Sequence, residues 1–288
     1  MDNYFVSSCK RVKDWICRQF GQKEKKTVHH KKFADGGEVI VWETGRAGEE
    51  AASYENLFLR KEIAGFRTNI RREQSCSIKS LTRDYLYKQL LSSGEYTFDH
   101  MLVIKDPYGE APLTALALFI LEEPACVRVT TKGNLKETDF VTELPKKKEH
   151  RVPILGMYAE KANDIVIEIL DDEGNCVKSH TFTIRTKRLP KSLRNVITVK
   201  KWTDKPAYSN IMINGGVKIH TCVFDIEGEI RYYLSRKPRG YGIFPLSDGH
   251  FFYMEKYISV PSYSNPQTVE SYDMDYFGRV FRTYLTEK

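Results

Sequence analysis

The feature that most limits the fold is a change of pattern near Tyr96, after which short apolar segments alternate with turn sequences. Leu113–Leu121 and Ile165–Leu170 are rich in the aliphatic and β-branched residues that favour strands. Asp106-Pro107-Tyr108-Gly109 places proline and glycine where a four-residue turn needs them. Short strands spaced by about ten residues are typical of an antiparallel sandwich. The pattern therefore predicts a mainly β chain with a β-sandwich over residues 95–187.

A weak repeat follows the predicted sandwich. Asp225-Ile226-Glu227-Gly228-Glu229-Ile230 and Asp275-Tyr276-Phe277-Gly278-Arg279-Val280 share an Asp-x-x-Gly-x-aliphatic pattern. Each unit predicts a hairpin turn between aromatic strands, and a period of about 50 residues with several strands is typical of propeller blades. Because a propeller needs at least about four blades to close, we expect a first, incomplete blade over residues 202–288. A basic linker is expected over residues 188–201.

The N-terminal region, residues 1–94, has a mixed pattern. Apolar residues recur at steps of three and four between residues 3 and 20, which predicts an amphipathic helix. Such a helix suits packing against protein or binding at a membrane surface, and both interpretations remain open. The remaining expectations are a polar linker, a short strand and two helical segments: Gln22–Lys32, Val39–Trp42, Glu50–Ile63 and Ser80–Ser92. No function emerges from this partly helical region.

The positive charge is concentrated at one end of the chain. Residues 1–32 hold nine Lys or Arg and three Asp or Glu, which accounts for nearly all of the net charge of +7. The rest of the chain is nearly neutral, so we expect no nucleic-acid partner. No apolar run approaches the ~20 residues that span a bilayer, and no signal peptide is evident. The expectations are no transmembrane segment and a cytoplasmic location.

The chain also lacks the patterns of common cofactor and metal sites. Its six cysteines are scattered, without the paired spacing that metal and redox sites use. They are Cys9, Cys17, Cys76, Cys126, Cys176 and Cys222. No glycine-rich phosphate-binding loop of the G-x-x-x-x-G-K-[ST] type is present. We therefore expect no cofactor and no metal.

Two longer motifs carry a family resemblance. Asp106-Pro107-Tyr108-Gly109-Glu110-Ala111-Pro112-Leu113-Thr114-Ala115 resembles the Asn-Pro-Tyr-Gly-x-Ala-Pro-Leu-Thr-Ala signature of the bacterial arylsulfate sulfotransferases, with Asp in place of Asn. His150-Arg151-Val152-Pro153-Ile154-Leu155-Gly156-Met157-Tyr158 is similar to a second signature of the same family. The segments Asp225–Leu234 and Leu246–Phe252 resemble its first propeller blade. The likeness covers about Tyr96–Lys288.

The resemblance implies a fold and a reaction. In that family an Ig-like β domain precedes a six-bladed propeller, and the enzymes move a sulfuryl group from a phenolic sulfate ester to a phenol without a nucleotide donor. A histidine in the propeller channel carries the group as a covalent intermediate. A neutral imidazole attacks sulfur, while cationic and amide donors stabilise the sulfate oxygens.

The family's catalytic histidines lie in later blades, and no histidine of this chain sits in such a motif. The seven are His29, His30, His100, His150, His180, His220 and His250. His250 is the tempting candidate, because it follows the turn Ser247-Asp248-Gly249, but no catalytic, cofactor-binding or metal-binding residue is assigned.

Two classes of function remain open. The first is the front part of a sulfotransferase, from a truncated frame or a split enzyme. It would be inactive alone and would meet an aryl sulfate or phenol only when completed by further blades. The second is a stand-alone interaction module or carbohydrate-binding module. A lone blade leaves apolar surface and a strand edge in water, so self-association or a second polypeptide is expected.

Overall fold

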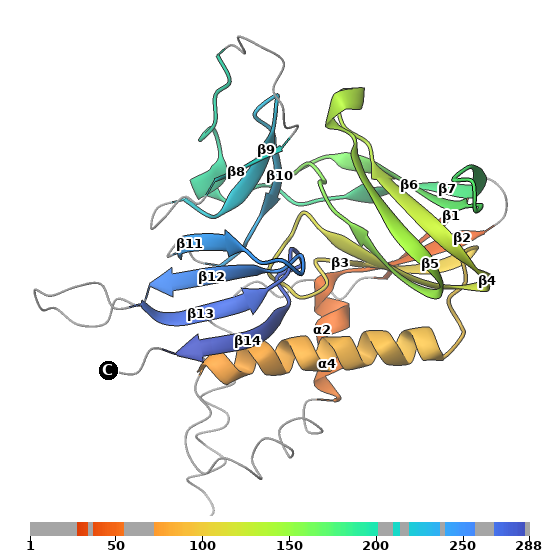
Figure 1. The fold of residues 1–288 in the computed structure, drawn as a ribbon, viewed down its shortest axis with the longest axis horizontal. Helices are drawn as coiled ribbons and strands as arrows, with labels where there is room; N and C mark the ends of the chain where they lie inside the picture. Colours follow the sequence, from red (N-terminus) through yellow and green to blue (C-terminus); the bar gives the residue numbers. More distant parts are fainter. Residues whose placement is uncertain are drawn as a thin grey trace, which may run out of the picture.

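The computed structural model describes residues 28–33, 37–54, 72–200, 210–213, 219–236, 240–256 and 268–285. Within them the chain is mainly β, as predicted, with two α-helices: α2 (Thr44–Ala52) and α4 (Arg72–Ser92) (Figure 1). The predicted helix over Ser80–Ser92 is confirmed as part of α4. The helix predicted between residues 3 and 20, and most of the one predicted over Glu50–Ile63, lie outside the described residues.

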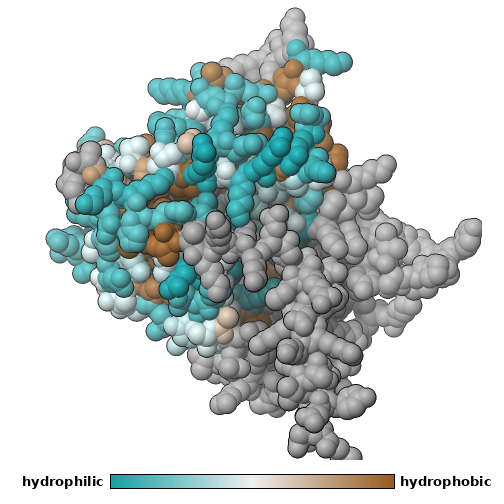
Figure 2. All heavy atoms as spheres, turned by 180° about the vertical axis from the view of Figure 1, so that it is seen from behind, coloured by the Kyte–Doolittle hydropathy of each residue, from teal (hydrophilic) through white to brown (hydrophobic). Residues whose placement is uncertain are grey.

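A seven-stranded sheet forms the larger body of the molecule. Its strands run in the order β1-β2-β3-β4-β6-β7, with β5 also paired to β4. Their bounds are β1 Val28–Lys32, β2 Glu38–Trp42, β3 His100–Lys105, β4 Ala115–Thr131, β5 Phe140–Ile154, β6 Ala162–Leu170 and β7 Cys176–Arg185. The sheet bends around one apolar core that includes Val103, Phe119 and Ile167, all fully buried. On the face shown in Figure 2, the coloured surface is mostly hydrophilic, with small separate apolar patches.

This sheet begins well before the boundary expected at residue 95. The short strand predicted over Val39–Trp42 is confirmed as β2, and its parallel pairing with β3 requires the long connection that α4 supplies. Val28–Lys32 was expected to be a polar linker, and that prediction is wrong because these residues form β1. Its side chains are mostly exposed at the edge of the sheet, so the apolar pattern of a strand is missing.

A further difference concerns strand length. The strand predicted over Leu113–Leu121 continues to Thr131, so that β4 has 17 residues. It runs through Glu122-Glu123-Pro124, where the pairing with β5 is irregular between Ile120 and Ala125, so the proline removes no regular ladder bond. The basic tract Lys146–Lys148 is exposed and lies within β5.

The C-terminal part holds two sheets, where one blade was expected over residues 202–288. A three-stranded sheet contains β8 (Asn210–Ile213), β9 (Cys222–Asp225) and β10 (Ile230–Tyr233). A four-stranded antiparallel sheet follows in the order β11-β12-β13-β14. Its strands are β11 Gly240–Pro245, β12 Phe251–Lys256, β13 Thr268–Met274 and β14 Val280–Leu285. The hairpin turns predicted from the repeat connect β9 to β10 and β13 to β14.

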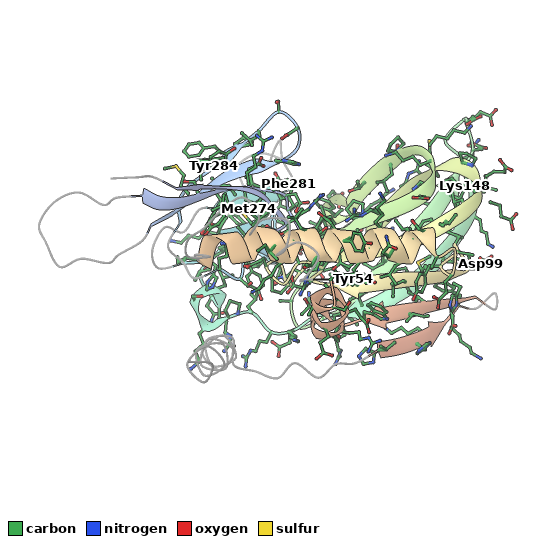
Figure 3. The ribbon with its side chains drawn as sticks, turned by 90° about the horizontal axis from the view of Figure 1, so that it is seen from below. Tyr54, Asp99, Lys148, Met274, Phe281 and Tyr284 are labelled. Carbon is green, nitrogen blue, oxygen red and sulfur yellow. The ribbon has the colours of Figure 1, made fainter. Side chains whose placement is uncertain are left out.

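Helix α4 joins the two parts of the molecule. Its Leu86, Tyr87 and Leu91 pack in an apolar cluster with α2 and with β2, β3 and β4. Near its other end, Ser80 Oγ accepts a hydrogen bond from the backbone N–H of Val280 in β14, at 2.9 Å. Figures 1 and 3 show the helix running past both the sandwich and the four-stranded sheet. The sandwich and the C-terminal sheets therefore share a common support.

Candidate functional site

All seven histidines lie in described segments, so each can be placed. His150 and His180 are buried in the sandwich. His180 stacks between Phe33 and Phe98, with ring centroids 4.0 and 4.6 Å away. The Nε2 of His150 is 2.9 Å from the carbonyl oxygen of Lys147, and burial lowers the pKa of His150. His180 Nε2 also lies 2.8 Å from Asp99 Oδ1, and both imidazoles pack as core side chains.

Four further histidines make ordinary polar contacts. His30 and His100 approach the carboxylate of Glu38 at 3.4 and 3.0 Å, and His29 lies 3.8 Å from Glu43. His220 lies with its Nδ1 2.8 Å from Ser192 Oγ, and burial lowers its pKa. Such contacts orient the imidazole ring at the surface or in a packed turn. Among the described residues, each of these four rings has a single carboxylate or hydroxyl group as its polar partner.

His250 has a different setting, in the turn between β11 and β12. Its Nδ1 lies 3.0 Å from Asp273 Oδ1 and 3.4 Å from Asp248 Oδ2. The ring stacks on Phe281 at 3.9 Å, and the side chain is 24% exposed. A carboxylate at Nδ1 favours the tautomer that leaves Nε2 as an acceptor, which is the arrangement of a histidine base or nucleophile. His100 has an equivalent contact, with its Nδ1 3.0 Å from Glu38 Oε1, so this arrangement is not confined to His250. His250 differs in having a second carboxylate, that of Asp248, near the same nitrogen.

The four-stranded sheet around His250 has two different faces. Tyr253, Tyr272 and Met274 point inward and are buried against Ala111 and the three-stranded sheet. On the other side lie Phe244, Phe252 and Tyr284, which we call the outer aromatic face. Phe244 and Tyr284 are 53% and 45% exposed. The labelled Tyr284 lies on the side of the sheet away from α4 (Figure 3).

The first family motif forms a turn that docks on α4. Asp106 has a φ of +46°, and its carboxylate accepts a hydrogen bond from the backbone N–H of Ala111 at 2.9 Å. Asn and Asp tolerate this left-handed conformation better than most residues, which explains why Asp can replace the Asn of the motif. The carbonyl oxygen of Pro107 accepts hydrogen bonds from Arg83 and Tyr87 of α4.

Asp84 of α4 collects three partners from three segments. It accepts a hydrogen bond from Tyr108 Oη at 2.6 Å, and it pairs with Arg151 at 3.2 Å and with Arg279 at 2.6 Å. Tyr108 belongs to the first motif, Arg151 to the second, and Arg279 to the β13–β14 turn. Burial raises the pKa of Tyr108, which keeps its hydroxyl a donor. We call this cluster the Asp84 joint.

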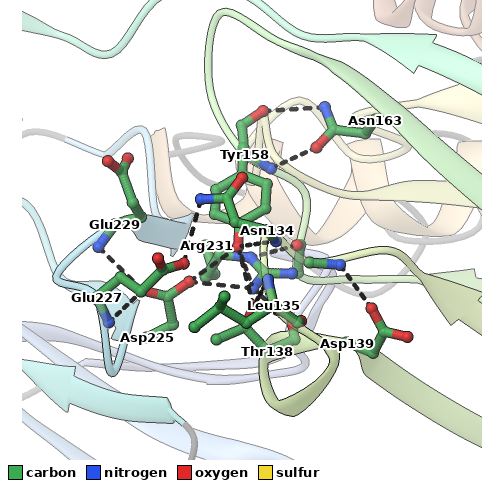
Figure 4. A network of polar contacts seen from close by, with 12 residues as sticks. Asn134, Leu135, Thr138, Asp139, Tyr158, Asn163, Asp225, Glu227, Glu229 and Arg231 are labelled. Atoms are coloured by element: carbon green, nitrogen blue, oxygen red, sulfur yellow. Dashed lines mark hydrogen bonds and ion pairs between the residues drawn. The ribbon is translucent and has the colours of Figure 1, made fainter.

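A second joint lies around Arg231 of β10 (Figure 4). Its guanidinium donates to the carbonyl oxygens of Gly156 and Thr138 at 2.6 and 2.8 Å and pairs with Asp225 at 3.2 Å. It also lies 4.0 Å from the ring centroid of Tyr158, whose hydroxyl donates to Asp225 at 3.1 Å. Arg231 and Asp225 are buried, and Asp225 is fully so. Gly156 and Tyr158 belong to the second motif, so that motif also ends at a joint.

Sequence reasoning missed both Asp84 and Arg231. Arg231 had a usable signal: it is the one charged residue in the run Ile230-Arg231-Tyr232-Tyr233-Leu234, which otherwise favours a buried strand. No sequence signal marked Asp84 as a contact residue, because an aspartate on an amphipathic helix normally faces water.

The described residues hold no group of three or more His, Cys, Asp or Glu placed to bind a metal ion. Among these residues, no helix is both long enough and apolar enough to cross a bilayer.

Comparison with known proteins identifies the sandwich. Residues 102–187 match the family model described as the arylsulfotransferase Ig-like domain. No curated protein matches the chain. The matched residues contain all of both motifs, so the resemblance stated from these motifs is confirmed.

Proposed function

We propose that this chain, whose residues 102–187 form an arylsulfotransferase Ig-like domain, serves sulfuryl transfer from phenolic sulfate esters to phenols. In this proposal the sandwich holds the first sheets of a catalytic β-propeller. Support comes from the four-stranded antiparallel order β11-β12-β13-β14, which is that of a propeller blade. The histidine that takes the sulfuryl group belongs to blades beyond these residues, so the chain is inactive alone.

The proposed chemistry follows from the ester. A neutral imidazole attacks the sulfur, the S–O bond to the aryl group breaks, and the phenolate leaves. An acceptor phenol then attacks the sulfohistidine and restores the imidazole. Hydrogen-bond donors around the sulfate oxygens stabilise the negative charge of these oxygens in both steps. The part assigned to the described residues is mechanical: they fix the position of the first sheets, on which further blades pack.

One observation carries this proposal over a free-standing domain. Both family motifs supply groups to the two joints with the C-terminal sheets. Tyr108 and Arg151 bind Asp84, which also pairs with Arg279, and the carbonyl oxygen of Gly156 and the hydroxyl of Tyr158 accept from Arg231. The backbone N–H of Ser235 also donates to the carbonyl oxygen of Glu110 at 2.8 Å. A binding module that functioned without the C-terminal sheets would not need these contacts between the sandwich and those sheets.

Release of nitrophenol from 4-nitrophenyl sulfate, with phenol as acceptor, tests the proposal. We expect no turnover by residues 1–288, and turnover when the chain is supplied with the remaining propeller blades of an arylsulfate sulfotransferase, fused or as a second polypeptide. His250→Ala should leave that restored activity unchanged. Turnover by residues 1–288 that His250→Ala abolishes would contradict the proposal and assign the nucleophile to His250.

A second candidate function rests on the outer aromatic face. Exposed aromatic rings stack on sugar rings or on a partner protein, so the exposed Phe244 and Tyr284, together with the half-buried Phe252, favour an interaction or carbohydrate-binding module. Such surface also promotes self-association. Sedimentation and glycan-array binding of the chain, compared with a Tyr284→Ser variant, test this alternative. A monomer that binds no glycan would leave the outer aromatic face without this role.

A further inference from the structure

A groove lies between β1 and β7, the two strands that end the order of the large sheet among the described residues. Its volume is about 550 Å³. The lining residues are His29, His30, Lys31, Val41, Glu43, Lys105, Thr183, Ile184, Arg185, Thr186 and Lys187. We call it the edge groove. None of its lining residues belongs to either joint, although the hydroxyl of Thr186 donates to the carbonyl oxygen of Tyr158. The groove plays no part in the proposed sulfuryl transfer.

The edge groove is lined by the backbone of β7 as well as by side chains. Five consecutive residues, 183–187, line it, whereas the side chains of a strand would reach one face only at alternate positions. On the β6 side, the N–H of Thr186 donates to the carbonyl oxygen of Lys161, and Asn163 Nδ2 donates to that of Ile184. On the other side, the carbonyl oxygen of Thr183 accepts from Lys31 Nζ of β1. Backbone groups of a strand alternate in direction, so Thr183 and Arg185 present theirs to the groove.

The side chains around this edge are mainly basic. Lys31, Lys105, Arg185 and Lys187 line the groove together with a single carboxylate, that of Glu43. Glu43 is already paired with Lys105 at 2.5 Å. Burial and the nearby charge of Lys105 lower the pKa of Lys31, so Lys31 and Lys105 are close enough to repel each other. An anionic occupant would relieve that repulsion.

We propose that the edge of β7 binds an extended acidic segment of a partner polypeptide as an added strand. The peptide backbone pairs with Thr183 and Arg185, and an N–H of the peptide replaces Lys31 Nζ at the carbonyl oxygen of Thr183. The released Lys31, with Arg185 and Lys187, binds carboxylates carried at alternate positions of the peptide. An open strand edge supplies the affinity in this mode of recognition, and the charges select the sequence.

Fluorescence anisotropy with the full chain tests the charge selection. The probe is a short labelled peptide of alternating glutamate and valine, and the reference is its lysine counterpart. We expect binding of the glutamate peptide only. Arg185→Glu should weaken it by about tenfold or more, as for loss of a close interfacial charge pair. Lys191→Glu is the matched control, because Lys191 is exposed in the turn after β7 and lies outside the groove, and it should change binding less than about twofold.

Two further measurements test the strand itself. A peptide with N-methyl groups on alternate amides keeps its charges but loses its hydrogen-bond donors, so it should not bind. Residue-resolved hydrogen exchange should show new protection at Thr183 and Arg185 and no change at Phe182 and Ile184, which face β6. Equal binding of the N-methylated peptide, or full competition by inorganic sulfate, would overturn strand addition and make the groove a small-anion site. Absence of binding would also overturn the proposal.

Discussion

The two copies of the Asp-x-x-Gly turn have the same local geometry. Asp225 Oδ1 accepts hydrogen bonds from the backbone N–H groups two and four residues later, at 3.0 and 3.1 Å. Asp275 Oδ1 does the same at 2.9 and 3.1 Å. Gly228 and Gly278 have φ angles of +83° and +76°, which glycine adopts without strain. Local sequence is sufficient to build both turns.

Their surroundings differ. The second oxygen of Asp225 is paired with Arg231 and Tyr158, so its buried charge has two partners. Asp275 has Arg279 nearby, but that guanidinium pairs with Asp84 at 2.6 Å. Burial raises the pKa of Asp275 to about 6. The buried carboxylate of Asp225 is therefore stabilised by its partners, whereas ionisation of the buried Asp275 is unfavourable. The two turns have the same local sequence pattern, so the difference comes from residues distant in the sequence.

Loss of Arg231 should have the largest effect. Arg231→Met leaves Asp225 buried without its cation and frees the carbonyl oxygens of Gly156 and Thr138, so we expect about 3–5 kcal/mol lower free energy of unfolding. Urea denaturation measures it. Arg188→Ala is the control, because Arg188 and Glu160 form an exposed ion pair at 3.3 Å, and it should cost less than about 1 kcal/mol.

The Arg231→Met, Asp225→Asn double variant sharpens this prediction. Removing both charges should cost less than the two single changes added together, because neither group is then left alone. Additive losses would show that Arg231 and Asp225 do not act as a pair.

Asp275 should show the next largest effect, in its pH dependence. Its pKa in the folded chain, about 6, is above its unfolded value, so the folded state binds the proton more tightly. The stability that this proton provides is complete below about pH 4 and is lost as the pH rises through 6. Asp275→Asn imitates the protonated acid. It should match the original chain near pH 4 and exceed its free energy of unfolding at pH 7 by about 2–3 kcal/mol.

Asp171 supplies the control for this pH effect. It occupies a similar turn between β6 and β7, and hydrogen bonds from Asn175 lower its pKa. The contribution of Asp171 is therefore present at neutral pH and lost as the pH falls, which is the opposite sign. If Asp275→Asn gave a pH-independent difference, Asp275 would be ionised as easily as an exposed aspartate.

The sequence predicted the parts of the fold that depend on local pattern. Turn residues located the hairpins after Asp225 and Asp275, and the apolar runs located β2, β6 and the first part of β4. It could not predict that β1 joins the sheet, because an exposed edge strand carries no apolar alternation. It could not show β4 as one strand either, since Pro124 marks an end in most strands but lies here at an irregular pairing.

The candidate sites were harder to predict. His250 was singled out from its turn, but Asp273 is 23 residues away and meets it only through the β12–β13 pairing. The joints depend on longer separations still, such as the 93 residues between Thr138 and Arg231. The motifs at residues 106–115 and 150–158 did mark the right segments. Their role as contact points with the C-terminal sheets required the structure.

The two turn glycines should differ by a smaller amount. Any side chain at these positive φ angles lowers the free energy of unfolding by about 1–2 kcal/mol. A Cβ at Gly278 would also lie 2.3 Å from Glu110 Cβ, whereas at Gly228 the nearest atom, a γ-methyl carbon of Val199, is 3.1 Å away and needs to move by only a few tenths of an ångström. Gly278→Ala should therefore cost about 1 kcal/mol more than Gly228→Ala in urea denaturation. Equal losses in the free energy of unfolding would mean that Glu110 moves away from the added methyl group without a measurable energetic cost.

Glu227 should show the smallest effect. It is the exposed residue of the first turn, and its Oε2 accepts a hydrogen bond from Asn134 Nδ2 at 3.2 Å, which links the turn to the sandwich. Water replaces an exposed contact easily, so Glu227→Ala should cost about 0.5 kcal/mol or less. Its counterpart Phe277 packs against the cluster beneath α4, and its ring lies 6.4 Å from that of Tyr108. Phe277→Ala, which removes buried apolar area, is the positive control in the same denaturation series. A loss at Glu227 as large as that at Arg231 would mean that the rim of the first turn, rather than its buried aspartate, attaches it to the sandwich.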